Sequence, residues 1–463
     1  MSVSRVLVAN RGEIAVRIIK ACHASGVETV AAVSEADRET LAAKMAKRAV
    51  CIGPPRSSDS YLKVESLIAA ARGTGCDALH PGYGFLAERA ELAQACADNN
   101  ITFIGPSPAN ITKMGDKLES RRIASAAGVP TVPGSEHAKN PHEAAVFADK
   151  LGYPVLLKAS AGGGGRGIKL VWSAGDIEST FRTAAAEARA AFGDDTLYME
   201  RYVANARHIE VQVLGDRFGQ VIHLGERDCS LQRRHQKIIE EAPAYALSPE
   251  VRAKICKAGA ALARSIGYQS AGTVEFIYDN DTAEFFFLEM NTRIQVEHPI
   301  TEMITGIDIV AQQLLIARDE PLPFAQSDIR FAGHAIECRI NAESPQHGFR
   351  PCPGRITRWE APQDGEVRLD THCFPGYVVP PYYDSLIAKL IVHGTDRSQA
   401  AGRMANALAA FQVEGIDTGI PFLQSVMSDP EYLRGKLNTR WLERKLEDYS
   451  AAVSSQPEPT RPR

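Results

Sequence analysis

Apolar and polar residues alternate along residues 285–298, where an apolar strand passes into a polar segment. Alternate side chains of an extended chain point to the same face. The polar face should comprise Glu289, Asn291, Arg293, Gln295 and Glu297. The residues expected to pack behind it are Leu288, Met290, Ile294 and Val296. Such a polar face could hold a metal ion, an anion and a proton acceptor together, although a solvated edge strand would show the same alternation.

The first 114 residues show the alternation of buried strands and amphipathic helices. Strands are predicted near residues 5–10, 29–33, 50–52, 78–80 and 103–106. Repeated strand–helix–strand order predicts a doubly wound parallel sheet. Because no Gly-x-Gly-x-x-Gly sequence follows the first strand, a dinucleotide site is disfavoured there.

A chain of 463 residues is too long for one compact core, so several units are expected. The predicted division is an α/β unit over 1–114, a hinge with a small α+β unit over 115–203, a long unit over 204–447, and a disordered tail over 448–463. The hinge is assigned to the segment 128–134, which is rich in glycine and proline.

Composition and charge narrow the class of protein. The 52 basic and 56 acidic residues give a net charge of −4, which predicts no general attraction to nucleic acid or membranes. No apolar run reaches the roughly 18 residues needed to span a bilayer, and the N-terminus does not resemble a signal peptide, so a cytoplasmic location is expected. Nine cysteines without a Cys-x-x-Cys pair predict neither a disulfide framework nor a zinc site.

A lysine followed by a glycine run indicates a phosphate-binding loop. Lys158 ends a predicted strand, and Gly163, Gly164 and Gly165 follow it. This order reverses that of a P-loop, so backbone N–H groups would close on phosphate oxygens while Lys158 supplies a charge. Lys117 could reach the same nucleotide. A flexible glycine linker is the alternative interpretation.

Further polar groups lie in the predicted strands of the long unit. Glu275 could bind a divalent cation together with Glu289, since Mg²⁺ prefers oxygen ligands. Glu200 is interpreted as free to accept a hydrogen bond from an adenine amine, and His208 shares a strand face with Glu210.

Two more segments are candidates for ligand contacts. In residues 226–237, Arg233, His235 and Lys237 would share a face if the chain is extended, and a solvated basic patch is the alternative. Tyr83 lies in the segment 80–88 at the carboxyl end of a strand, where α/β proteins bind ligands.

Taken together, these segments resemble the ATP-grasp ligases, and within that group the sequence closely resembles biotin carboxylase. The similarity is carried by residues 9–15, 80–86, 227–237 and 289–299, and it extends over about residues 3–447. It implies an ATP-grasp fold with a mobile glycine-loop lid, preceded by the doubly wound domain.

The resemblance also implies a reaction. ATP, with Mg²⁺ or Mn²⁺, would activate bicarbonate as carboxyphosphate, and the carboxyl group would pass to biotin. Because the sequence contains no Ala-Met-Lys-Met biotinylation motif, biotin is expected on a separate carrier protein. The chain would catalyse the first half-reaction of a multisubunit carboxylase, such as acetyl-CoA carboxylase, with carboxyltransferase subunits as partners. The final carboxyl acceptor is left open.

Site residues follow from the same resemblance. The nucleotide would contact Lys117, Lys158, Gly163, Gly164, Gly165, Glu200, His208, Gln232 and His235. The metal would be held by Glu275, Glu289 and Asn291. Bicarbonate and biotin would contact Tyr83, Lys237, Arg293, Gln295, Val296 and Arg339. Glu297 would take the proton of bicarbonate, and Arg339 would stabilise carboxyphosphate and the biotin enolate.

Several positions depart from the family pattern, and three of them fall at the dimer contact. Lys20, Ala24 and Gly365 stand where members with a known dimer contact often have arginine, glutamate and phenylalanine. An oligomer is therefore expected, with the family-type dimer weakened. Two other functions stay open: an ATP-grasp ligase for another acid, and a nucleotide-binding subunit without turnover.

Overall fold

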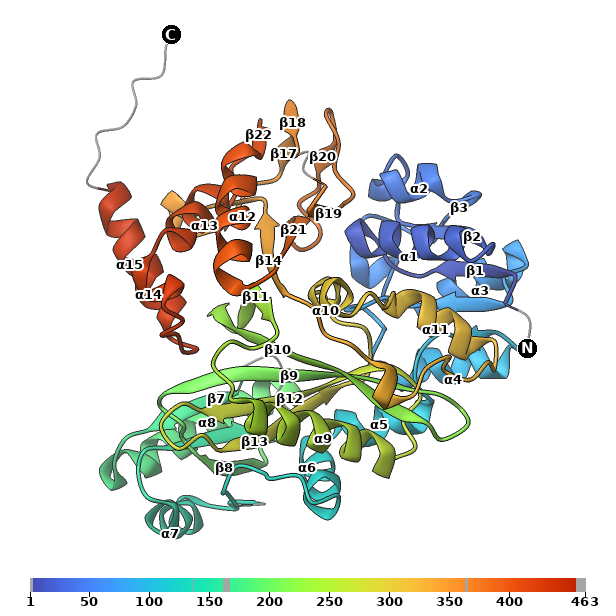
Figure 1. Cartoon of the computed structure of the whole chain (residues 1–463). Coiled ribbons are helices and arrows are strands. Elements are labelled where there is room, and N and C mark those ends of the chain that lie inside the picture. Colours follow the sequence, from blue (N-terminus) through green and yellow to red (C-terminus); the bar gives the residue numbers. More distant parts are fainter. Residues whose placement is uncertain (1–2, 136, 161–166, 363–364, 455–463) are drawn as a thin grey trace.

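The N-terminal unit is a five-stranded parallel sheet with helices on both faces (Figure 1). The computed structural model describes residues 3–135, 137–160, 167–362 and 365–454. The strands, in the order β3-β2-β1-β4-β5, are β1 (Arg5–Val8), β2 (Glu28–Val33), β3 (Arg48–Cys51), β4 (Ala78–His80) and β5 (Thr102–Phe103). The helices include α1 (Gly12–Ala24), α3 (Val64–Thr74) and α4 (Ala90–Asp98). Val6 and Val8 pack with α1, whereas Leu7 packs with α3 and α4, which confirms the predicted doubly wound sheet.

A long sheet of eight strands forms the centre of the molecule, and its strand pairs are antiparallel. In the order β13-β12-β9-β10-β11-β14-β21-β19, the strands are β13 (Phe285–Asn291), β12 (Ser270–Asp279), β9 (Ala206–Gly215), β10 (Val221–Arg233), β11 (Gln236–Ala242), β14 (His334–Asn341), β21 (Leu386–Gly394) and β19 (Val367–Thr371). Helix α9 (Pro249–Ser265) packs on one face, and α11 (Ile309–Ala317) lies between the other face and the N-terminal unit. Helices α12 (Arg397–Ala410), α13 (Ile420–Met427) and α15 (Trp441–Ser454) cover the end that contains β14 and β21.

A small α+β unit with its own hydrophobic core lies beside the long sheet (Figure 1). It consists of the antiparallel strands β7 (Ile168–Val171), β6 (Val155–Ala159) and β8 (Leu197–Arg201), with α7 (Pro141–Leu151) and α8 (Ile177–Phe192). Lys158 lies in β6 as expected. The predicted glycines Gly163, Gly164 and Gly165 lie outside the described residues, and the hinge at 128–134 stays a prediction.

Two predicted extended segments end earlier than the residue pattern indicated. Strand β13 stops at Asn291 because the next backbone N–H, that of Thr292, is bound by the carboxylate of Glu88 at 3.1 Å instead of a neighbouring strand. Residues 234 and 235 form the turn between β10 and β11, with φ of 48° for Arg234 and 65° for His235. Arg233, His235 and Lys237 therefore do not lie along one extended strand.

The predicted start of the disordered tail at residue 448 is wrong. Helix α15 continues to Ser454, because Leu442, Leu446 and Tyr449 recur at helical spacing and pack on the core of the C-terminal helices. Residues 455–463 lie outside the described part of the chain. The other predicted boundaries, at 114 and 203, stay predictions.

No single helix within the described ranges is long and apolar enough to cross a membrane. One bent pair, α10 (His298–Thr305) with α11, meets the length and composition requirement, with an angle of 95° between its helices.

Candidate active site

A cavity of about 820 Å³ lies between the small α+β unit and the long sheet. Every predicted site residue within the described ranges lines it. These are Tyr83, Lys117, Lys158, Glu200, His208, Gln232, His235, Lys237, Glu275, Glu289, Asn291, Arg293, Gln295, Val296, Glu297 and Arg339. The structure thus brings together residues from separate segments, while their individual roles stay predictions.

The five residues of the predicted polar face all line the cavity, but the strict alternation of polar and apolar side chains does not hold. Leu288 and Val296, which were expected to pack behind it, also line the cavity. In the pairing with β12, Glu275 lies opposite Glu289 but Phe276 lies opposite Phe287, so Leu288 is an extra residue in β13. Such a bulge turns a side chain toward the opposite face. Val296 follows the end of the strand, where alternation no longer holds.

One ammonium group forms the electrostatic centre of the cavity. Lys237 Nζ lies 2.9 Å from Glu275 and 2.6 Å from Glu297, and it also donates to Glu210. Burial alone would lower the pKa of Lys237, but these carboxylates raise it well above its usual value. Lys237 is therefore positively charged, and the three carboxylates share its charge.

Glu297 is held as an ionised carboxylate. Its second oxygen accepts from Arg339 Nη2 at 2.8 Å. Burial alone would raise the pKa of Glu297, but Lys237, Arg339 and Arg227 lower it well below its usual value. Glu297 also immediately precedes α10, whose N-terminal dipole favours a negative charge.

Two carboxylates facing one another across β12 and β13 form a candidate metal site. Glu275 and Glu289 are register partners, and Asn291 Nδ2 donates to Glu275 Oε1 at 2.7 Å. The carboxylate of Glu289, which lies in the ladder between β12 and β13, makes no hydrogen bond or ion pair with another described residue. Burial, together with the charge of Glu275, raises the pKa of Glu289. A divalent cation would relieve this repulsion, so this set of oxygen ligands fits Mg²⁺.

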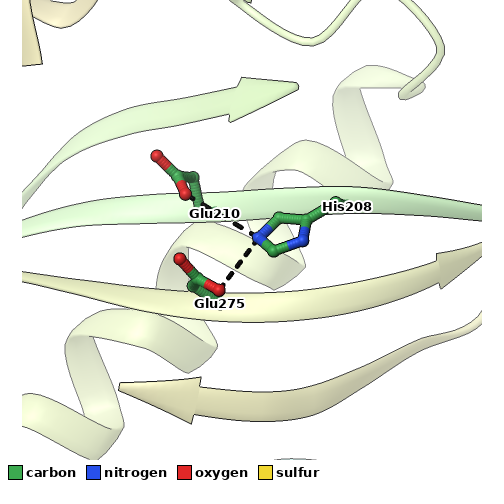
Figure 2. Close-up of side chains that lie close together, drawn as sticks. All are labelled: His208, Glu210 and Glu275. Atoms are coloured by element: carbon green, nitrogen blue, oxygen red, sulfur yellow. Dashed lines mark ion pairs between the residues drawn. The ribbon is translucent and has the colours of Figure 1, made fainter. Parts of the chain in front are cut away.

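His208 lies next to that pair and contacts two carboxylates. Figure 2 shows the ring directed at two carboxylates, with Nε2 3.0 Å from Glu275 and 3.8 Å from Glu210. Burial alone would lower the pKa of His208, but Glu275 outweighs it and the net shift is upward. In the three-residue cluster of Figure 2, the two carboxylates favour the protonated form of the imidazole ring.

The interpretation of Glu200 as a free acceptor is wrong. Its carboxylate is buried and forms ion pairs with Lys158 and Arg121. A buried carboxylate needs such partners to offset its lost hydration. Glu200 therefore fixes Lys158 at the cavity wall.

Several contacts of the site were not predicted from the sequence. Glu88 binds Arg293 Nε at 2.8 Å and so positions the guanidinium, and Glu210 pairs with the fully buried Arg227. Lys389 Nζ donates to the carbonyl of Val296 at 2.8 Å. The available signal for Lys389 was a cation within the apolar run 386–392 of β21.

Three family models match successive parts of the chain. "Biotin carboxylase, N-terminal domain" matches residues 2–111, "Carbamoyl-phosphate synthase L chain, ATP binding domain" matches 116–325, and "Biotin carboxylase C-terminal domain" matches 337–444. These three matches contain every predicted site residue that lines the cavity.

Curated and solved relatives are similar over almost the full length. The chain is 49% identical to biotin carboxylase 1 of Bacillus subtilis, over 95% of this chain and 98% of the relative. A solved biotin carboxylase component of a pyruvate carboxylase superimposes with a TM-score of 0.84 at 48% identity, over 96% of this chain and 99% of that chain. The biotin carboxylase domain of the Hydrogenobacter thermophilus 2-oxoglutarate carboxylase, solved as a dimer with MgADP, ADP and bicarbonate, superimposes with a TM-score of 0.90 at 49% identity, over 95% of this chain and 97% of that chain.

Replacement of Glu289 by Gln tests the metal site. The variant should bind Mn²⁺ at least about tenfold more weakly, since loss of partners outside the ligand set alone typically costs about 10- to 100-fold. Binding is measured by electron paramagnetic resonance. Glu284→Gln, in the exposed turn between β12 and β13, is the control. Equal Mn²⁺ affinity in Glu289→Gln and the unmodified protein would exclude Glu289 as a ligand.

Proposed function

Because this chain belongs to the biotin carboxylase family, we infer that it catalyses the ATP-dependent carboxylation of biotin with bicarbonate. A bicarbonate oxygen attacks the γ-phosphorus of ATP and gives ADP and carboxyphosphate. Carboxyphosphate breaks down to CO₂ and phosphate, the phosphate takes the proton of the biotin ureido nitrogen, and that nitrogen captures CO₂.

One observation carries this proposal: a cluster of cations lies beside the two-carboxylate metal site in a single cavity. Lys237, Arg293 and Arg339 all line it. Bicarbonate is a weak nucleophile, and its attack on an anionic phosphate depends on charge neutralisation and positioning more than on covalent catalysis. This arrangement supplies both.

The proton acceptor is activated by the substrate. A carboxylate whose pKa is lowered by Lys237 is a weak base. When bicarbonate enters, its negative charge competes with Glu297 for Lys237 and Arg339. The pKa of Glu297 then rises, and the carboxylate can take the bicarbonate proton. The same two cations next stabilise carboxyphosphate and the negative charge that develops on biotin.

The nucleotide would be held by side chains of the small unit, the long sheet and the helix α6 (Lys117–Ala126). Lys117 and Lys158 supply positive charge to the phosphates, and Gln232 and His235 lie nearby on the β10–β11 hairpin. Glu275, Glu289 and Asn291 would hold Mg²⁺, which when bound screens the charge of the β- and γ-phosphates.

Carrier and transferase partners complete the reaction. Biotin carboxylases are parts of biotin-dependent carboxylases, so we assign a biotin carrier protein and a carboxyltransferase as partners. Similar relatives belong to carboxylases named for different carboxyl acceptors, pyruvate and 2-oxoglutarate, at almost equal identity. The acceptor is therefore a property of the transferase partner, and it is identified by co-purification.

The function is tested by the dependence of ATP cleavage on the other substrates. ADP release should require bicarbonate and should rise with free biotin. The reason is that Lys237, Arg293 and Arg339, which would bind bicarbonate, lie in the same cavity as the residues that would bind the phosphates of ATP. Steady-state ADP formation is measured with and without each compound. ATP cleavage that is indifferent to both would favour a ligase for another acid.

The proton acceptor and the anion-stabilising arginine are tested by substitution. Glu297→Gln keeps size and polarity but removes the base, and Arg339→Ala removes a positive charge. Each should lower the rate of biotin carboxylation on the order of 100-fold or more, with ATP affinity little changed. Glu226→Gln, another buried glutamate paired with an arginine, is the control because it lies outside the cavity. A near-normal rate in Glu297→Gln would show that another group takes the proton.

We also propose that a family-type dimer is weak in this protein. Lys20 and Ala24 are exposed on α1. Arg368 is paired within the chain with Asp370 and Glu302, so it is not free to bind a carboxylate of a second copy. A lysine offers a point charge where an arginine would bind a carboxylate bidentately, and Gly365 offers no aromatic anchor.

Sedimentation velocity across a concentration series measures the dimer. The protein should dissociate at micromolar concentration, and Lys20→Arg with Ala24→Glu should strengthen association by restoring an ion pair. A dimer that persists at nanomolar concentration, with Lys20 buried at its two-fold axis, would contradict this expectation.

A further inference from the structure

A buried lysine of β21 holds the backbone of the turn 295–297, which contains the predicted bicarbonate contacts Gln295 and Val296. Lys389 lies in β21 and its side chain is 0% exposed. Its Nζ donates to the carbonyl oxygen of Val296 at 2.8 Å. The same Nζ lies 3.1 Å from Glu13 and 3.8 Å from Asp370. A buried ammonium is costly without such partners, so this charge is fixed in one position.

The sheet register aligns this lysine with the arginine of the site. Lys389 lies opposite Arg339 of β14 and opposite Asp370 of β19, so the three side chains share one face. Arg339 binds the carboxylate of Glu297. Lys389 binds the carbonyl of the preceding residue, Val296. Neighbouring strands thus hold two consecutive residues of the turn 295–297.

A histidine fixes the remaining peptide group of that turn. His298 is fully buried, and its Nδ1 donates to the carbonyl of Gln295 at 2.8 Å. In a trans peptide the N–H points away from the C=O. A fixed Gln295 carbonyl therefore fixes the direction of the Val296 N–H, and a fixed Val296 carbonyl fixes that of the Glu297 N–H. The turn 295–297 is held from behind at both peptide groups.

The carboxylate that holds Lys389 also holds a residue on another wall of the cavity. Glu13, at the start of α1, accepts from the hydroxyl of Tyr83. The same atom, Glu13 Oε1, lies 3.1 Å from Lys389 Nζ. Tyr83 lines the cavity from the N-terminal unit, whereas Val296 lines it from the long sheet. One carboxylate oxygen therefore links two walls that come from different parts of the chain.

We propose that Lys389 is a positioning residue for bicarbonate. Lys389 and Tyr83 both contact the same oxygen of Glu13. Through this oxygen, Lys389 fixes the position of the turn 295–297 relative to Tyr83, the predicted biotin contact. Loss of the ammonium frees the Val296 carbonyl, so the turn and Glu297 move relative to bicarbonate. This proposal rests on the proposed function of the same cavity. The alternative role is a simple ion pair that docks α1 on the sheet, which would contribute to stability alone.

Lys389→Met is the principal test, because it keeps the length of the side chain and removes the charge. The KM for bicarbonate should rise at least about tenfold, and kcat for bicarbonate-dependent ADP release should fall on the order of 100-fold, since small misplacements of reacting groups have effects of this size. The KM for ATP should stay within about twofold, because Lys389 does not line the cavity in which the nucleotide would bind.

Arg397→Met is the matched control. Arg397 is also buried, and it pairs with Glu241 and the carbonyls of Tyr432 and Leu433, outside the cavity. Its removal should lower the melting temperature without changing the KM for bicarbonate. If Lys389→Met has the same pattern as Arg397→Met, with lower stability and unchanged bicarbonate kinetics, the positioning role is wrong.

A double-mutant cycle tests the link between the two walls. Because Tyr83 and Lys389 share one oxygen of Glu13, Tyr83→Phe and Lys389→Met should have non-additive effects on the KM for biotin. Tyr83→Phe combined with Arg397→Met should be additive. Additivity in both combinations would refute the coupling.

If circular dichroism shows that Lys389→Met does not fold, Glu13→Gln tests the proposal in its place. Glu13→Gln leaves the ammonium in place and weakens its hold. It should raise the KM for bicarbonate and that for biotin by at least about threefold each, and unchanged values would overturn the proposal. ATP cleavage by the unmodified protein is measured in parallel: if it is independent of bicarbonate, the proposed function itself has failed, and the positioning role falls with it.

Discussion

Burial of several carboxylates around one ammonium is the constraint on which the site depends. Glu210, Glu275 and Glu297 all contact Lys237, and they approach one another closely enough that none could remain ionised there alone. Arg227 and Arg339 supply further positive charge. Lys237 contacts three carboxylates and Arg339 contacts two. An entering anion could therefore replace one carboxylate as the partner of either cation. In the proposed reaction, bicarbonate would therefore need no further positive charge at the site.

The long sheet makes this cluster possible. Glu210, Glu275 and Lys237 come from β9, β12 and β11, and Arg339 comes from β14. Side chains that are register partners on neighbouring strands lie on the same face, so the spacing of the charges is set by the hydrogen bonds of the sheet. A hydrophobic core on each side, beneath α9 and beneath α11, fixes this register, because a slip by one residue would move every charge to the opposite face.

The N-terminal unit contributes to the same cavity through polar contacts. Glu88 orients Arg293, and Tyr83 shares Glu13 with Lys389. The docking of α1 and the loop after β4 against the sheet therefore affects the anion site directly. The doubly wound sheet therefore contributes side chains that position residues of the cavity.

The sequence by itself determined the doubly wound sheet, the small α+β unit and many of the polar residues that line the cavity, because hydrophobic periodicity and long motifs are local properties of the chain. It could not show where β13 ends, since that end depends on the carboxylate of Glu88, about 200 residues earlier in the chain. Nor could it show that Glu200 is paired, that residues 448–454 are helical, or that Lys389 holds the Val296 carbonyl. Only the tertiary structure decided these features, because each is a contact between segments distant in sequence, and the free energy of a buried charge or a docked helix depends on what surrounds it.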